Sequence, residues 1–222
     1  MLDVVGDLLP YAVGVALSPL PLIAVLLVLG SPSPRAAAGL FLFARYASVT
    51  VLALVVAFGA ELLPDSQGEP VIGAVLRIVL GAALIGWAVQ KTVRWAGGRH
   101  ESSELPGWMA SIGDTTPARA ARLAIILSVA NVKEVAFGVG AGLTIAAGGL
   151  GPAATTVTAV LYATLACAAV IAVVVLAWLA PDRVGPALDR VRDWLVANSK
   201  IVIAAVLLVI GAILVGEGLR TL

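Results

Sequence analysis

Cysteine, histidine and charged residues are all scarce in this 222-residue sequence, and each scarcity argues against a class of function. The one cysteine, Cys167, excludes an internal disulfide and a Cys-x-x-Cys redox pair. The one histidine, His100, has no histidine or cysteine beside it with which to hold a metal ion. Neither a Ser/His/Asp set nor a nucleotide-binding motif is present. We therefore expect no enzymatic activity, no cofactor and no metal site.

Charge is equally sparse, at 12% of residues, about half of what soluble proteins carry. The net charge of +1 gives no support to a nucleic-acid partner. In contrast, 61% of residues are hydrophobic and the mean hydropathy is +1.07. Several apolar runs reach the ~20 residues that a helix needs to cross ~30 Å of hydrocarbon. The composition predicts an all-α, multi-pass membrane protein.

Six apolar segments predict six transmembrane helices, over residues 11–30, 36–60, 71–91, 120–147, 152–180 and 200–219. They divide into two three-helix repeats, 1–95 and 118–222, which a cytoplasmic linker at 96–117 joins. Because three is an odd number, the second repeat is expected to be inverted in the membrane relative to the first.

Basic residues predict the orientation. Ten lysines and arginines lie in alternate connections, at Arg35, within 91–122 and within 183–200, and the opposite side holds only Arg220. Connections rich in lysine and arginine stay in the cytoplasm. We therefore expect a protein of the cytoplasmic membrane with both termini outside.

The first predicted span contains an interruption. The segment "GVALSPLPLIAVLLVLGSPSPR" carries Pro19 and Pro21 inside its apolar run, where proline costs roughly 3 kcal/mol. The first span of the second repeat contains "SVANVKEVAFGVGAG", which places Asn131, Lys133 and Glu134 at a similar depth. A kink satisfied by neighbouring helices is one explanation of the prolines. Matched interruptions in inverted repeats instead mark the central site of many transporters. We predict that residues 18–21 and 131–134 lie together near the bilayer centre.

Four ionisable residues fall at membrane depth: Arg45, Arg77, Lys133 and Glu134. Each costs at least ~2.5–3.5 kcal/mol at a helix centre, so each needs a partner or water. Glu134 is the expected partner of Arg45, and Arg77 is close enough to the outer surface to reach it by snorkelling. Three cations and one anion leave two positive charges uncompensated. This excess predicts an anionic ligand, which half-helix N-termini would help to bind.

Two quoted segments carry a family resemblance. "ALSPLPLIAVLLVLGSPSPR" and "PGWMASIGDTTPARAARLAIILSVANVKE" resemble the Gap family of mycobacteria and other actinobacteria. These are peptidoglycolipid-addressing and sulfolipid-addressing proteins of the lysine exporter (LysE) superfamily. The resemblance implies six spans in two inverted repeats and a role in exporting lipids or small molecules. It places paired functional motifs on Ser18, Pro19 and Pro21 and on Asn131 and Lys133.

The sequence departs from the family pattern at two places. Val132 stands where relatives usually have proline, so we expect the second interruption to be milder than the first. Ala44 and Arg45 stand where relatives tend to have Gly-Trp, which points to a different substrate.

The function we expect is gradient-driven export of an anionic lipid or small molecule by alternating access, with Glu134 as a candidate proton carrier. Two alternatives stay open: a non-transporting accessory or scaffold protein in a glycolipid or sulfolipid export complex, and an exporter of another small molecule or a metal. The expected partners are membrane lipids, the anionic substrate and lipid-export machinery. A homodimer is a further expectation, because the glycines of "FGVGAG" and "GGLG" suit close helix packing.

Overall fold

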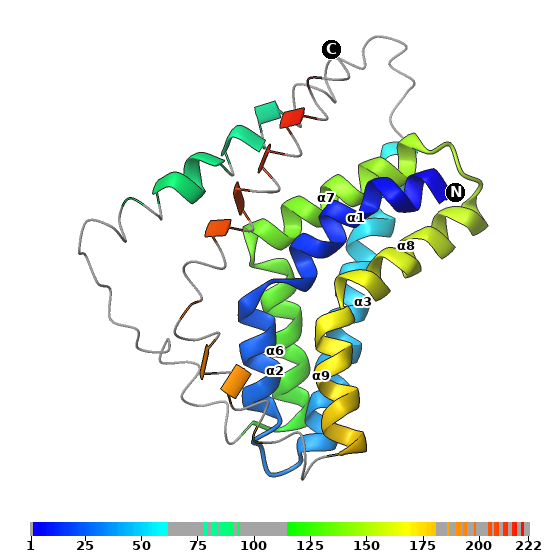
Figure 1. Cartoon of the computed structure of the whole chain (residues 1–222). Helices are drawn as coiled ribbons and strands as arrows, with labels where there is room; N and C mark the ends of the chain where they lie inside the picture. Colours follow the sequence, from blue (N-terminus) through cyan, green and yellow to red (C-terminus); the bar gives the residue numbers. More distant parts are fainter. Residues whose placement is uncertain are drawn as a thin grey trace.

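The computed structural model describes residues 2–61 and 115–180 continuously, with scattered residues between 78 and 93 and between 186 and 219. All regular structure in these residues is helical, which confirms the all-α class (Figure 1). The helices are α1 (Leu2–Ala16), α2 (Pro19–Val28), α3 (Pro34–Glu61), α6 (Pro117–Val129), α7 (Val132–Ala147), α8 (Pro152–Ala166) and α9 (Ala168–Leu179). Four of them (α2, α3, α6 and α8) begin on a proline, the residue whose fixed φ and missing N–H suit the first helical position.

Among the described residues, one helix is long and apolar enough to span a membrane by itself, and three further pairs are so only if each bent pair counts as one span. Residues Pro34–Ala60 of α3 are long and apolar enough to span. The pairs α1–α2, α6–α7 and α8–α9 bend by 54°, 69° and 63°, and with them the described residues hold up to four spans. The predicted spans at 71–91 and 200–219 fall largely outside the described residues. Six spans and the inverted repeat therefore stay predictions.

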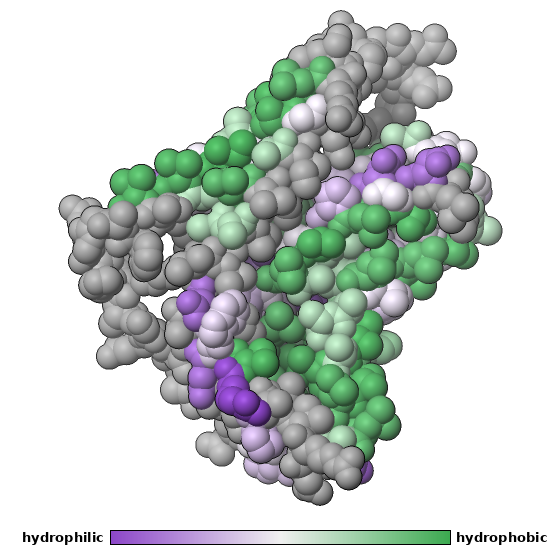
Figure 2. Space-filling model, viewed as in Figure 1, coloured by the Kyte–Doolittle hydropathy of each residue, from purple (hydrophilic) through white to green (hydrophobic). Residues whose placement is uncertain are grey.

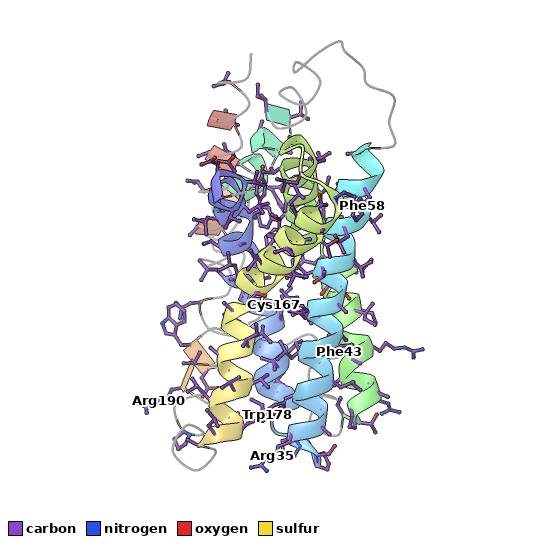
Figure 3. The ribbon with its side chains drawn as sticks, turned by 90° about the vertical axis from the view of Figure 1, so that its right-hand side faces the viewer. Arg35, Phe43, Phe58, Cys167, Trp178 and Arg190 are labelled. Carbon is purple, nitrogen blue, oxygen red and sulfur yellow. The ribbon has the colours of Figure 1, made fainter. Side chains whose placement is uncertain are left out.

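The bend at Cys167 between α8 and α9 was not predicted, because no proline or polar residue marks it in the sequence. Cys167, labelled in Figure 3, lies midway along the molecule. Its N–H still bonds to Ala163 and its carbonyl still accepts from Ile171, so the chain bends without losing these bonds. Packing explains the bend: α8 lies against α1 and α9 against α2, so the pair follows the bend between α1 and α2.

The bends divide the molecule into two separately packed cores. In Figure 1, α1, α7 and α8 gather at the upper end, α2, α6 and α9 at the lower end, and α3 runs through both. The upper core joins α1, α7, α8 and the second half of α3 around Tyr11, Phe137, Tyr162 and Cys167. The lower core joins α2, α6, α9 and the first half of α3 around Val25, Phe41, Ala124 and Val174.

The outer surface is apolar where a soluble protein's would be polar. Phe43, Val55 and Leu179 are 63–78% exposed, whereas Arg45, Lys133 and Glu134 are at most 4% exposed. Figure 2 shows broad apolar areas over the described helices. Arg35 and Arg190 both lie at the lower end (Figure 3), the end where α3 and α6 begin. Apolar side chains outside and charges inside are the arrangement expected in lipid.

The glycines of α7 pack inside the molecule. A Cβ atom on Gly142 would lie 2.6 Å from the Cβ of Val56 and 2.9 Å from the carbonyl oxygen of Ala53, and one on Gly140 would meet the ring of Tyr11. The predicted role in close helix packing is therefore confirmed for the glycines of "FGVGAG", within a single chain, but not for Gly149 and Gly151 of "GGLG", where a Cβ would have nothing within 4 Å. The same glycines give no reason to expect a homodimer, which stays a prediction without that argument.

Candidate functional site

The first break lies between α1 and α2, and proline chemistry explains it. Pro19 has no N–H to donate to Val15, so the N–H of Ser18 bonds to the Val15 carbonyl at 3.1 Å instead of continuing the helix. Ser18 is extended, with φ −67° and ψ 115°, and α2 starts directly after it. The shift of the Ser18 N–H to Val15 frees the carbonyl of Gly14, the residue that Ser18 would bond in an unbroken helix.

Lys133 donates to this freed carbonyl. Its Nζ lies 3.3 Å from the Gly14 oxygen and 5.8 Å from the centre of the Phe137 ring, and the residue is 4% exposed. No carboxylate lies within salt-bridge distance of Lys133 among the described residues. The lysine thus links the two broken pairs of helices and keeps a positive charge that a carbonyl dipole and a ring face compensate only in part.

The second break, between α6 and α7, corrects the expectation of a milder interruption. The bend there is 69°, larger than the 54° at the two prolines, although Val132 replaces the proline. Asn131 is extended, with φ −85° and ψ 99°, and precedes the first turn of α7. Two contacts anchor that turn, Lys133 with Gly14 and Glu134 with Arg45. Hydrogen bonds to α1 and α3 therefore stabilise this bend, which has no proline to cause it.

Both breaks open onto one cavity of about 180 Å³, which we call the break pocket. The two segments that the sequence analysis expected to find together are therefore adjacent. Three apolar residues complete the wall beside the polar groups. The lining residues are Ser18, Pro19, Leu20, Trp87, Asn131, Lys133 and Leu207.

Arg45 forms the expected ion pair with Glu134, away from the break pocket. Its Nη1 lies 2.9 Å from Oε2 and its Nη2 lies 3.2 Å from Oε1, a two-pronged contact between side chains that are 1% and 2% exposed. Nη1 also donates to the Ser128 hydroxyl at 3.4 Å. Ser128 is in the last turn of α6 and Glu134 in the first turn of α7, so Arg45 bridges the second break from α3.

A second cavity of about 150 Å³, the pair cavity, lies beside this ion pair. Four of its residues carry polar side-chain atoms: Ser48, Ser128, Glu134 and Tyr162. The Tyr162 hydroxyl is buried and has no hydrogen-bond partner among the described residues. The other lining residues are apolar.

The predicted site residues thus separate into two groups. Ser18, Pro19, Asn131 and Lys133 line the break pocket, and Pro21 is buried in α2 outside its lining. Arg45 and Glu134 form the ion pair, with Glu134 on the pair cavity. Arg77 lies outside the described residues.

Within the described residues, Arg45 is compensated by Glu134, and Lys133 is a buried cation without a carboxylate partner. Arg77, the third cation of that count, lies outside them, so the expected excess of two positive charges stays a prediction. Sequence reasoning also missed Gly14, Ser128 and Tyr162. The last could have been noticed as a tyrosine in the middle of an apolar span, whereas nothing in the sequence marks the freed Gly14 carbonyl.

Comparison with known proteins places the chain in one family. No curated protein and no solved structure matches it. The family of the sulfolipid-1-addressing protein, Sap, matches residues 8–220, nearly the whole length, and agrees with the resemblance seen in the sequence. This helical membrane protein, whose broken helices enclose charged residues beneath an apolar exterior, belongs to the sulfolipid-1-addressing (Sap) family.

Proposed function

We propose that the protein is a gradient-driven transporter that moves an anionic lipid or small molecule across the cytoplasmic membrane, and that the break pocket binds the anionic group. The observation that carries this proposal is the position of Lys133. It lies between two broken helices, on a cavity, with no carboxylate partner among the described residues. A buried cation in this situation favours an anion as its partner.

The helix ends at the break pocket support the same ligand class. The first turn of α7 directs N–H groups without intrahelical partners, and the positive end of the helix dipole, towards this region. Asn131 makes no side-chain capping bond there. Pro19 and Pro21 remove two such N–H groups from the start of α2, so recognition of an anion falls mainly to α7.

The apolar wall of the break pocket supports an amphiphile. Leu20, Trp87 and Leu207 lie beside Lys133 and Asn131 in the lining. A headgroup with a negative charge would contact the lysine, and an attached apolar chain would contact this wall. The family name connects its members with addressing of a sulfolipid, which is a molecule of this class.

The helix contacts support alternating access. In an inverted repeat, α1 would correspond to α6, α2 to α7, and α3 to the pair α8–α9. The contact of α1 with α7 then has its counterpart in the contact of α6 with α2, and the contact of α1 with α8 has its counterpart in the contact of α6 with α3. The upper and lower cores meet at the level of the bends, where a change of bend angle would alter which end is open.

Transport assays in liposomes test the proposal. Wild-type protein should move a fluorescent lipid bearing a sulfate more rapidly than matched neutral and cationic lipids. Lys133→Met should lower the rate about tenfold or more, because a buried hydrogen bond to a charged group contributes about 1.5–3 kcal/mol. Arg122→Met, which removes an exposed cation of α6, is the matched control and should leave the rate unchanged.

The alternative of an accessory or scaffold protein predicts a different result. In that case neither wild-type nor variant protein moves any of the three lipids, although the protein is folded in the liposomes. Equal transport of cationic and anionic lipids would also contradict the proposal.

A further inference from the structure

The pair cavity contains a buried acid and a buried hydroxyl that the binding of an anion does not use. Glu134 is 3% exposed and Tyr162 is 1% exposed, and both line this space. The ion pair uses both carboxylate oxygens, whereas the Tyr162 hydroxyl bonds to nothing among the described residues. A buried hydroxyl without a partner is costly and rare, so its position beside an acid calls for a ligand that contacts both.

The size and chemistry of the cavity limit what that ligand is. A volume of about 150 Å³ has room for a few water molecules, which occupy about 30 Å³ each in the liquid. The hydroxyls of Ser48 and Ser128 add further hydrogen-bonding groups. A metal cation is disfavoured because the Arg45 guanidinium already occupies both carboxylate oxygens. A proton carried by water needs neither a ligand shell nor displacement of the arginine.

We infer that the pair cavity is a proton-binding site, in which the Glu134 carboxylate accepts a proton from water in the cavity and the Tyr162 hydroxyl hydrogen-bonds the resulting acid. The proton comes from the aqueous phase as hydronium: one O–H bond of the hydronium breaks, one O–H bond forms on Glu134, a neutral water molecule is left, and the side chain passes from a charge of −1 to neutral. The inference deepens the proposed transport function and rests on it only for the consequence that follows.

Protonation removes the charge that holds Arg45 across the second break. Arg45 bridges Ser128 at the end of α6 and Glu134 at the start of α7, so a neutral Glu134 weakens the bridge. The first turn of α7 also carries Lys133, which projects into the break pocket. A proton on one side of this turn therefore changes the anion site on its other side.

The surrounding charges determine when the proton is taken up. Protonation without an anion would leave Arg45 and Lys133 both uncompensated, whereas an anion beside Lys133 removes one of those charges. Proton uptake and anion binding should accordingly favour each other. The ionisable groups that face this layer come from α1, α3, α7, α8 and the α8–α9 bend: Tyr11, Arg45, Lys133, Tyr162 and Cys167.

Infrared difference spectroscopy of the whole protein in lipid nanodiscs tests the inference. As the pH is lowered through the range in which the protein stays folded, wild-type protein should show the carbonyl stretch of one buried protonated acid. Glu134→Gln should abolish this band. Asp7→Asn, which removes an exposed carboxyl of α1, should retain it. The band should grow at higher pH when cholesteryl sulfate, an anion at every pH used, is added.

Tyr162→Phe provides the decisive second variant, because it removes only an oxygen without a partner and should fold even if Glu134→Gln does not. The carbonyl stretch should shift to higher frequency, since the acid loses a hydrogen bond, an effect that a purely structural tyrosine would not produce. Absence of a band in wild-type protein, or an identical band in Tyr162→Phe, would overturn the inference. Lys133→Met separates the two proposals: it should abolish the cholesteryl sulfate effect and leave the Glu134 band itself in place.

Discussion

At the scale of single residues, the buried charges of Arg45 and Glu134 compensate each other, whereas the buried charge of Lys133 has no carboxylate partner among the described residues. The guanidinium of Arg45 contacts both oxygens of the Glu134 carboxylate, at 2.9 and 3.2 Å, whereas Lys133 contacts only a carbonyl and a ring face. Glu134 and Lys133 are neighbours in sequence and project about 100° apart on the helix. The first turn of α7 therefore places Glu134 on the pair cavity and Lys133 on the break pocket.

The ion pair leads to a prediction about stability. Arg45→Met alone should lower the free energy of unfolding by about 3–5 kcal/mol, because it leaves the Glu134 charge buried and alone. Arg45→Met combined with Glu134→Gln should recover most of that loss, since no unpaired charge remains. Unfolding of the purified variants in detergent, followed by circular dichroism, measures both. A double variant no more stable than the single one would show that the pair is not the source of the effect.

At the scale of helices, the sequence predicted the positions of two breaks and missed the third. Pro19 and Pro21 indicate the first break in the sequence, and the polar run at Asn131 indicates the second. Its sharpness could not be read from Val132, because the bend depends on bonds to Gly14 and Arg45, which are distant in sequence. The bend at Cys167 has no local signal at all, since it follows from packing against the bent pair α1–α2.

The close approach of α7 to α3 gives a prediction at the same scale. Gly142→Ala should destabilise the protein by about 1–3 kcal/mol, because its Cβ would lie 2.9 Å from the backbone oxygen of Ala53, which cannot move aside alone. Gly59→Ala is the matched control, in a helix with nothing within 4 Å of the new Cβ, and should be neutral or slightly stabilising. Thermal unfolding of the two variants side by side measures the difference. Equal effects would mean that α7 and α3 do not pack this closely.

At the scale of the whole molecule, composition was enough to predict a helical membrane protein, and the pairing of two distant polar segments was enough to predict a common pocket. The division into an upper and a lower core was not predictable, because both cores consist of the same apolar residue types. The division of the charged residues between two cavities was equally hidden, since it depends on which side of α7 each side chain takes. Both features arise from tertiary packing rather than from local pattern.

The central claim is that an anion binds between the two breaks, and cross-linking tests it most directly. In a Cys167→Ala background, cysteines replacing Ser18 and Asn131 should react together with a short thiol cross-linker, since both residues line the break pocket. Cysteines replacing Ser18 and Thr156, an exposed residue of α8, are the control pair and should not. Cholesteryl sulfate should protect the first pair from reaction, and neutral cholesterol should not. Failure of the first pair to cross-link, or equal protection by both sterols, would contradict the account.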